Sequence, residues 1–186
     1  PFKSEFLQHA AAAHISTTWA YGVARSESLF MRDVRSSAGA IGLMQLLPKT
    51  GRAVAKSLNL SYSGLNTLTD PQSNIRLGTT YLGQMAERYG GNRVLATAAY
   101  NAGPHRVDRW MPEQGWIDAR VWIENIPFNE TRRYVRRVMA AETIFNWRLT
   151  GTTRRLKDAL TAVGAHDGTA VSAGAHGALL QRSNIH

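Results

Sequence analysis

Apolar residues in the first 150 positions recur every three or four places, which is the spacing of one face of an α-helix. One such set shares a face after Asp70: Ile75, Leu82, Met85, Ala86 and Tyr89. A second set shares a face after Asn129: Tyr134, Val138, Ala141, Phe145 and Leu149. The alternation of apolar and polar residues that is typical of strands is almost absent, so the pattern predicts an all-α fold.

Capping residues set the expected limits of the first helices. Ser16 or Thr17 can begin a helix that runs to about Ser28. Pro48 suits the first turn of a helix that reaches about Leu58. The segment between them, around residues 36–42, contains glycine and is expected to be a short turn region.

The later helices have similar signals at their ends. Asp70-Pro71 is an N-cap followed by proline in the first turn, and Gly90-Gly91 ends that helix. Asn92 is expected to cap the next helix, which Gly103-Pro104 stops. Asn129 is expected to cap the last one.

The chain changes character after residue 150. From Gly151 to His186 there is no Phe, Trp or Tyr, and the stretch is rich in Gly, Ala, Ser and Thr. Such a segment lacks the large apolar groups that offset the entropy cost of ordering. We therefore expect one folded domain over residues 1–150 and a disordered tail over 151–186, with a short helix possible over 154–163.

Composition narrows the classes of protein. The 186 residues suit one domain, and no apolar run approaches the roughly 20 residues of a membrane-spanning helix. The absence of Cys excludes disulfides, thiolate metal sites and a cysteine nucleophile. The net charge of +9 favours a polyanionic partner, whether nucleic acid, anionic lipid or an acidic polymer. Because the chain starts at Pro1, we expect it to be a processed or excised piece.

Glu27 is the first candidate for chemistry. Together with Ala20, Val23 and Ala24 it follows the i, i+3, i+4, i+7 pattern, so a carboxyl group stands where the apolar face should continue. Desolvation there would raise the pKa of Glu27, and a carboxylic acid that keeps its proton near neutral pH can act as a general acid. The alternative is a structural carboxylate that is paired near the helix end.

Two further segments combine small residues with isolated polar groups. In residues 36–48 the glycines allow close approach of backbone, and Gln45 interrupts an apolar run. In residues 98–104, Tyr100 and Asn101 end a helix of small residues and can present donors to a cleft. The alternatives are a tight loop for the first segment and a core tyrosine for Tyr100.

Five segments of the chain, within roughly residues 10–148, resemble the catalytic domain of the soluble lytic transglycosylases. They are Glu27-Ser28 with residues 39–48, Asp70-Pro71 with Asn74-Ile75, residues 99–103, residues 124–128, and Glu130-Thr131-Arg132 with Tyr134. One such motif would be weak, whereas five in sequence are specific. Segments 126–128 and 130–131 resemble a subfamily in which this domain closes a long helical region, which implies the C-terminal part of a larger chain.

The resemblance implies a goose-lysozyme-like helical fold and an enzyme without cofactor or metal. It implies cleavage of the β-1,4 bond between N-acetylmuramic acid and N-acetylglucosamine in peptidoglycan, with a 1,6-anhydromuramoyl product. The family's catalytic acid falls on Glu27, and a serine near the sugar's N-acetyl group falls on Ser36. Gln45, Tyr100 and Asn101 match cleft positions, and Glu124 matches a second carboxylate lining the site.

A single carboxylate changes the expected mechanism, since most glycosidases use two. Apart from Asp33, no second carboxylate follows Glu27 closely. The 2-acetamido oxygen of the substrate can stabilise the cation at C1, with Ser36 orienting the acetamido group and Tyr100 supporting it or Glu27. Glu27 would first protonate the glycosidic oxygen and then take the proton from the C6 hydroxyl as that oxygen attacks C1.

Several alternatives stay open. The nearest is a lysozyme-type hydrolase that uses water; others are a non-enzymatic nucleic-acid binder and an inactive peptidoglycan-binding module. Glu124 can instead pair with one of the many arginines, such as Arg120 or Arg132, and the arginines at 132–137 can simply form a solvated helix face. Trp110, Trp116 and Trp122 are expected to fill a core. The leading interpretation has peptidoglycan strands and no nucleic acid as partner, a monomer, and the periplasm as location.

Overall fold

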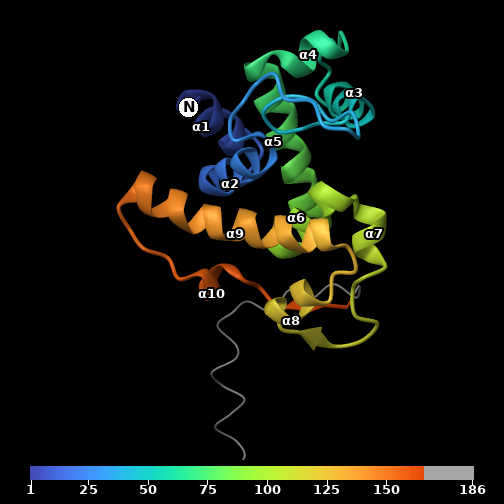
Figure 1. Cartoon of the computed structure of the whole chain (residues 1–186), viewed down its shortest axis with the longest axis vertical. Helices are drawn as coiled ribbons and strands as arrows, with labels where there is room; N and C mark the ends of the chain where they lie inside the picture. The colour runs from blue at the N-terminus through green and yellow to red at the C-terminus, as the bar shows by residue number, and fades with distance from the viewer. Residues whose placement is uncertain (166–186) are drawn as a thin grey trace, which may run out of the picture.

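The computed structural model describes residues 1–165, and within them it contains ten helices and one two-stranded sheet (Figure 1). The first five helices are α1 (Lys3–Ala12), α2 (Thr17–Ser28), α3 (Pro48–Ser57), α4 (Leu65–Thr69) and α5 (Pro71–Arg88). The other five are α6 (Arg93–Ala102), α7 (Pro104–Asp108), α8 (Ala119–Glu124), α9 (Asn129–Thr150) and α10 (Leu156–Ala159). The strands are β1 (Trp116–Ile117) and β2 (Val163–Gly164), which pair antiparallel. The predicted all-α class is confirmed.

The long helix α9 runs across the middle of the molecule, with α2 packed along it and α6 beside it (Figure 1). Gly22 permits the approach of α2 to α9, because a Cβ there would lie 2.9 Å from the carbonyl oxygen of Val138. Trp19 is buried in this layer, and its Nε1 donates to the Thr97 hydroxyl of α6 at 3.0 Å. Three helices are thereby held in one core.

The expected helix limits agree with the structure at most ends. The side chains of Ser16, Asp70 and Asn92 accept backbone N–H groups at the starts of α2, α5 and α6. At α9 the prediction is off by one residue, since Phe128 is the N-cap and Asn129 is already helical. Leu149, expected on the buried face of α9, is exposed because the last turn extends past the core.

The structure adds helices that the periodicity did not predict. Helix α1 packs on α5, and its buried Phe6 stacks on Tyr21 of α2 with ring centres 4.7 Å apart. Helices α4, α7 and α8 have only five or six residues each, which is too short for a periodic signal.

The segment after α9 differs from the expected disordered tail as far as residue 165. Helix α10 lies within the predicted range 154–163. Val163 is fully buried, and the Asn92 side chain donates to the Ala162 carbonyl at 2.9 Å. Backbone pairing with β1 and two small buried side chains hold a segment without aromatic residues, so the folded part extends beyond 150. The remainder of the expected tail, residues 166–186, lies outside the described residues.

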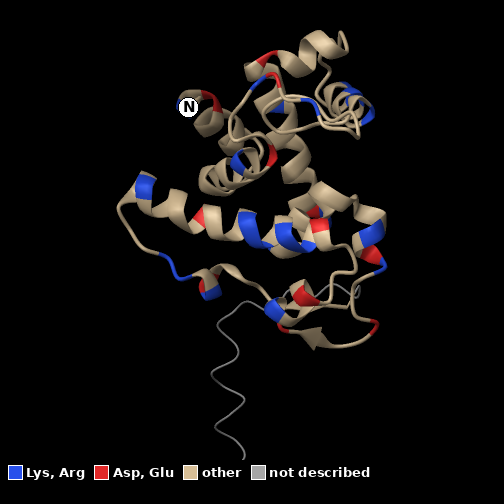
Figure 2. Cartoon of the chain, in the orientation of Figure 1, with Lys and Arg blue, Asp and Glu red and all other residues tan. Residues whose placement is uncertain are grey.

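Two surface properties complete the fold. Basic residues occur on several elements and follow one another along α9 (Figure 2). Among the described residues, no helix has both the length and the apolar character needed to cross a membrane.

Candidate active site

Glu27 lies in the last turn of α2, one residue before the helix ends. The Ser28 hydroxyl is buried and donates to the Leu43 carbonyl at 2.8 Å, which attaches this helix end to the loop before α3. Leu29 then adopts the left-handed conformation with φ of 53° and turns the chain away. The carboxyl group of Glu27 is therefore held at the junction between a rigid helix and a loop.

Burial dominates the electrostatics of Glu27. It raises the pKa of this carboxyl group to about 7, because the charged form is poorly solvated. Attraction to Arg137 and interaction with the Tyr134 hydroxyl lower the pKa, whereas the charge of Glu130 raises it. Among the described residues, no basic side chain forms an ion pair with Glu27. The group can thus hold or release a proton near neutral pH.

One face of α9 supplies the groups that act on Glu27: Glu130, Tyr134 and Arg137. These residues are spaced by four and three positions, so they share a stripe of the helix. The Tyr134 side chain is buried, and its Oη makes no hydrogen bond of full geometry. It nevertheless lies close enough to Glu27 to interact as a weak donor, and its own pKa is raised mainly by burial and then by Glu27.

Tyr100 of α6 is a second buried tyrosine that interacts with Glu27. Its buried hydroxyl donates to the Met44 carbonyl at 2.7 Å, and its ring centre lies 5.2 Å from that of Tyr81. The pKa of Tyr100 is raised by burial and then by the charge of Glu27. Tyr100 and Tyr134 therefore flank Glu27 electrostatically, from α6 and α9 respectively.

The loop before α3 is fixed by side-chain amides. Asn74 donates to the carbonyls of Ile41 and Leu68 and accepts from the Met44 N–H at 2.7 Å. Gly42 has φ of 82°, and a side chain there would collide with Leu68 and Asn74. The loop thus keeps one conformation beside the end of α2.

Gln45 and Ser36 both belong to this loop. The Gln45 amide donates to the carbonyls of Val34 and Gly42 at 2.9 Å each, so it braces the turn. The Ser36 Oγ accepts the Ala40 N–H at 3.0 Å and leaves its own hydroxyl proton available to a ligand. Ser36 and Gln45, both predicted as site residues, thus lie in the same loop as Met44, whose carbonyl accepts the Tyr100 hydroxyl.

Asn101 joins the end of α6 to the start of α9. Its Oδ1 accepts the Thr131 hydroxyl at 2.7 Å. Since Thr131 follows Glu130 directly, this bond helps to set the position of the carboxylate that acts on Glu27.

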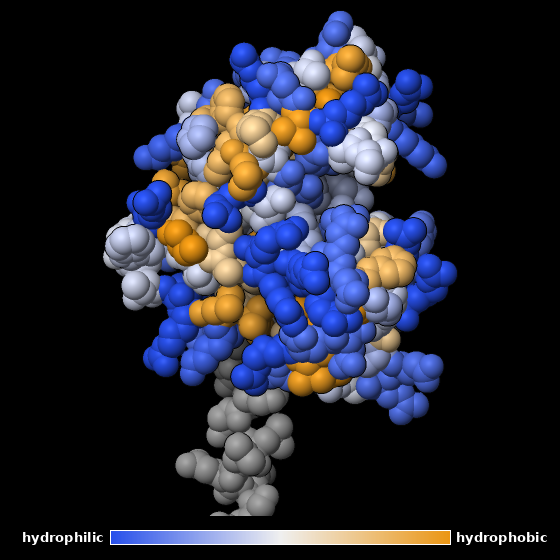
Figure 3. Space-filling model, viewed as in Figure 1, coloured by the Kyte–Doolittle hydropathy of each residue, from blue (hydrophilic) through white to orange (hydrophobic). Residues whose placement is uncertain are grey.

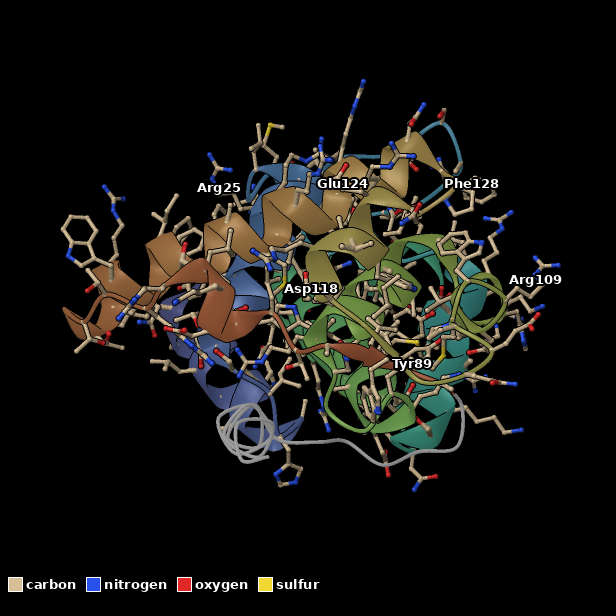
Figure 4. All side chains as sticks on the ribbon, turned by 90° about the horizontal axis from the view of Figure 1, so that it is seen from below. Arg25, Tyr89, Arg109, Asp118, Glu124 and Phe128 are labelled. Atoms are coloured by element: carbon tan, nitrogen blue, oxygen red, sulfur yellow. The ribbon has the colours of Figure 1, made fainter. Side chains whose placement is uncertain are left out.

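Glu124 has the ion pair with an arginine that the sequence left open as the alternative to a cleft role. It lies at the end of α8, is exposed, and forms an ion pair with Arg136 rather than with Arg120 or Arg132 (Figure 4). Arg136 and Glu124 line a hollow with Leu156 and Leu160, away from the stripe of α9 that acts on Glu27. The structure does not bring Glu124 to Glu27; Glu130 is the second carboxylate that acts on it.

Two residues of the site were missed as site residues by the sequence analysis. Tyr134 was assigned to the core face of α9, and Glu130 was quoted only as part of a motif. The available signal was their separation of four residues, which places both on one helical stripe. The sequence did not show that this stripe also meets Glu27, because that contact depends on the packing of α2 on α9.

Comparison with protein families gives a match over most of the chain. The family model described as "Transglycosylase SLT domain" matches residues 4–123. The soluble lytic murein transglycosylase of Salmonella typhimurium is 41% identical over 142 residues, which cover 75% of this chain and 22% of that protein. The Escherichia coli K12 protein of the same name is 40% identical over 144 residues, covering 76% of this chain and 22% of the relative.

Solved structures are similar as well. An inactive mutant of lytic transglycosylase Slt from Pseudomonas aeruginosa has a TM-score of 0.79 and 38% identity, over 84% of this chain and 26% of that one. The 70 kDa soluble lytic transglycosylase of Escherichia coli has a TM-score of 0.75 and 36% identity, over 81% of this chain and 25% of that one. The chain thus spans only about a quarter of the length of these proteins.

Proposed function

The chain belongs to the Transglycosylase SLT domain family, and we propose that it cleaves the β-1,4 bond between N-acetylmuramic acid and N-acetylglucosamine in peptidoglycan. The product in this proposal carries a 1,6-anhydromuramoyl end. Relatives of which this chain covers 22% are named soluble lytic murein transglycosylases. The site around Glu27 supplies the chemistry that such a reaction needs.

The raised pKa of Glu27 is the observation that carries the proposal. A carboxyl group with a pKa of about 7 is protonated in a large fraction of molecules near neutral pH. It can therefore donate a proton to the glycosidic oxygen and, as carboxylate, accept one afterwards. In the second step it takes the proton of the C6 hydroxyl, whose oxygen forms the bond to C1.

The neighbours of Glu27 fit supporting roles. The free hydroxyl proton of Ser36 can bond the acetamido carbonyl of the substrate, which supports the cation at C1. The Tyr100 hydroxyl donates a hydrogen bond to the Met44 carbonyl. Its contribution in this proposal is therefore to hold the loop and to exclude water from Glu27. Tyr134 can donate to the Glu27 carboxylate after the first proton transfer. Gln45 and Asn101 keep the loop and the start of α9 in position.

One observation favours a rival reaction. Glu130 acts on Glu27, and a second carboxylate near the acid is what a water-using glycosidase needs. Its effect on Glu27 is the smallest of the four interactions, behind burial, Tyr134 and Arg137. We favour intramolecular attack by the C6 hydroxyl because the relatives are named transglycosylases.

Mass spectrometry of digested sacculi separates the two reactions. The expected muropeptides have anhydro ends, which are lighter than hydrolysed reducing ends by one water. Products with only hydrolysed ends would establish a lysozyme-type hydrolase, and no released products would leave a binding module.

Location and assembly follow from the substrate. Peptidoglycan as partner suits an enzyme of the periplasm that acts as a monomer, and its positive charge suits strands whose stem peptides carry carboxylates. Fractionation of cells, and light scattering of the purified chain, test these two points.

A further inference from the structure

An exposed aromatic residue stands at the start of α9, where α7 also ends. Phe128 is 44% exposed although it is a large apolar side chain. The Trp110 ring meets it edge-on with ring centres 5.3 Å apart, and the Arg106 guanidinium lies 5.1 Å from the centre of its ring. We call Phe128, Trp110 and Arg106 the aromatic ledge.

The ledge is fixed in place by its neighbours. The Trp110 carbonyl accepts the Trp122 Nε1–H at 2.9 Å, and Trp122 itself is buried. Arg106 also donates to the Ala102 carbonyl at 3.3 Å. An aromatic side chain held this way loses little entropy when a ligand covers it. Its exposure is therefore suited to binding rather than to packing within the described chain.

The charge of the ledge is not neutralised locally. Among the described residues, no carboxylate forms an ion pair with Arg106. Arg109 lies toward the same end of the molecule as Phe128 (Figure 4) and likewise has no ion pair within residues 1–165. On the side of α7, apolar atoms are bordered by hydrophilic ones in the space-filling view (Figure 3). The surface thus combines an apolar face with positive charge.

The position of the ledge connects it to the site. Phe128 precedes Asn129 and Glu130, and Glu130 acts on Glu27. On the other side, α7 follows α6 directly, whose Asn101 is bonded to Thr131 of α9. Phe128 therefore lies next to the first turn of α9, which carries the carboxylate that acts on Glu27.

We propose that the aromatic ledge is an additional subsite for the peptidoglycan strand, in which a sugar ring packs against the exposed part of Phe128 that Arg106 does not cover and a stem-peptide carboxylate binds Arg106. The proposal rests on the proposed function for the identity of the strand. The C–H groups of a pyranose match the electron-rich face of an aromatic ring, and a guanidinium pairs well with a carboxylate. Binding energy from such a remote sugar helps to place the scissile bond at Glu27.

The first test compares Phe128→Ala with Trp147→Ala. Trp147 is 54% exposed near the opposite end of α9, so it is a matched loss of an exposed aromatic residue. We expect Phe128→Ala to raise KM for long strands by about 5- to 10-fold with little change in kcat. Trp147→Ala is expected to leave KM unchanged, and equal thermal midpoints would show that both variants are folded.

A second test separates the sugar from the peptide. Arg106→Gln is compared with Arg148→Gln, which is exposed in the last turn of α9, on strands with peptides and on strands stripped by an amidase. We expect Arg106→Gln to weaken only the binding of peptide-bearing strands, and Phe128→Ala to weaken the binding of both.

Binding measured in the Glu27→Gln background keeps this proposal separate from the proposed function. Weaker strand binding by Phe128→Ala in that background supports the subsite even if the wild-type chain releases no anhydro products. Equal binding and equal KM in Phe128→Ala and wild type would overturn the subsite, although anhydro products from the wild type would still support the function.

Discussion

Two glutamates on packed helices, Glu27 of α2 and Glu142 of α9, show how differently one fold treats a buried carboxyl group. In both, burial is the main cause of a raised pKa. Glu142 is only 3% exposed and forms an ion pair with Arg93, and attraction to Arg154 also opposes the effect of burial. Glu27 is partly exposed, and no arginine is in ion-pair contact with it among the described residues.

The difference separates a structural carboxylate from one available for chemistry. Arg93 favours the ionised form of Glu142 and donates to one of its oxygens, and burial leaves this carboxyl group almost no surface for a ligand. The neighbours of Glu27 are two tyrosines and two charges of opposite sign, and burial outweighs them, so Glu27 holds its proton more tightly than a solvated glutamate and can still release it near neutral pH. Burial alone therefore does not distinguish the two glutamates; the lack of an ion pair among the described residues and the partial exposure of Glu27 do.

The largest expected effect is on turnover in Glu27→Gln. Removing the only proposed acid and base should lower the rate of anhydro-product release about 10²- to 10⁴-fold, while the fold is retained because the amide has nearly the same shape. The rate is measured on purified sacculi, with circular dichroism as control. A variant with near-wild-type rate would remove Glu27 from the mechanism.

The pH dependence of stability is the next effect. Between about pH 4.5 and pH 7, Glu27 binds its proton in the folded chain but loses it on unfolding. The folded state then holds more protons than the unfolded state, so stability falls as pH rises through this range. Glu27→Gln lacks this dependence and should gain on the order of 1–2 kcal/mol relative to wild type between pH 5 and pH 8. If the free energies of unfolding of wild type and Glu27→Gln differed by the same amount at both pH values, the raised pKa of Glu27 would be contradicted.

Glu142→Gln should differ from Glu27→Gln in turnover, which it is expected to leave unchanged. The variant loses the Arg93 ion pair but also a buried charge whose pKa is raised by burial, so the free energy of unfolding should change by less than about 1 kcal/mol near neutral pH, with anhydro-product release close to wild type. Denaturant unfolding and the sacculus assay measure the two quantities. An inactive but equally stable variant would reverse the roles assigned to the two glutamates.

Glu124→Gln is expected to have the smallest effect. Because the Glu124–Arg136 pair is exposed, its loss should change stability by less than about 1 kcal/mol. Turnover should also stay near wild type, since Glu124 lies outside the environment of Glu27. A large fall in kcat in the sacculus assay would restore the second-carboxylate role that the sequence suggested.

The sequence was sufficient for the parts of the fold that are local. Apolar spacing and caps at Ser16, Asp70 and Asn92 predicted α2, α5 and α6, because helix ends are set by nearby side chains. The segment 151–165 was expected to be disordered because its composition is poor in large apolar groups. Its order comes from pairing with β1 and from Asn92, which are contacts between distant parts of the chain.

The candidate site was likewise predictable only where it depends on local sequence patterns. The break in the apolar face made Glu27 a candidate, and the motif segments that resemble the family pointed to Glu27, to the loop and to Tyr100. The sequence could not distinguish Glu124 from Glu130, since both are acidic residues of the motif segments and lie only six positions apart. The choice depends on tertiary packing, because Glu124 ends α8 and pairs with Arg136, whereas Glu130 lies on the stripe of α9 that acts on Glu27.

The pH dependence of kcat/KM for anhydro-product release tests the central claim most directly, because it reports the proton that Glu27 must hold before it acts. The account predicts that the rate falls above about pH 7 as Glu27 loses its proton. A rate that already falls near pH 4.5, the ordinary range of a solvated glutamate, would contradict it.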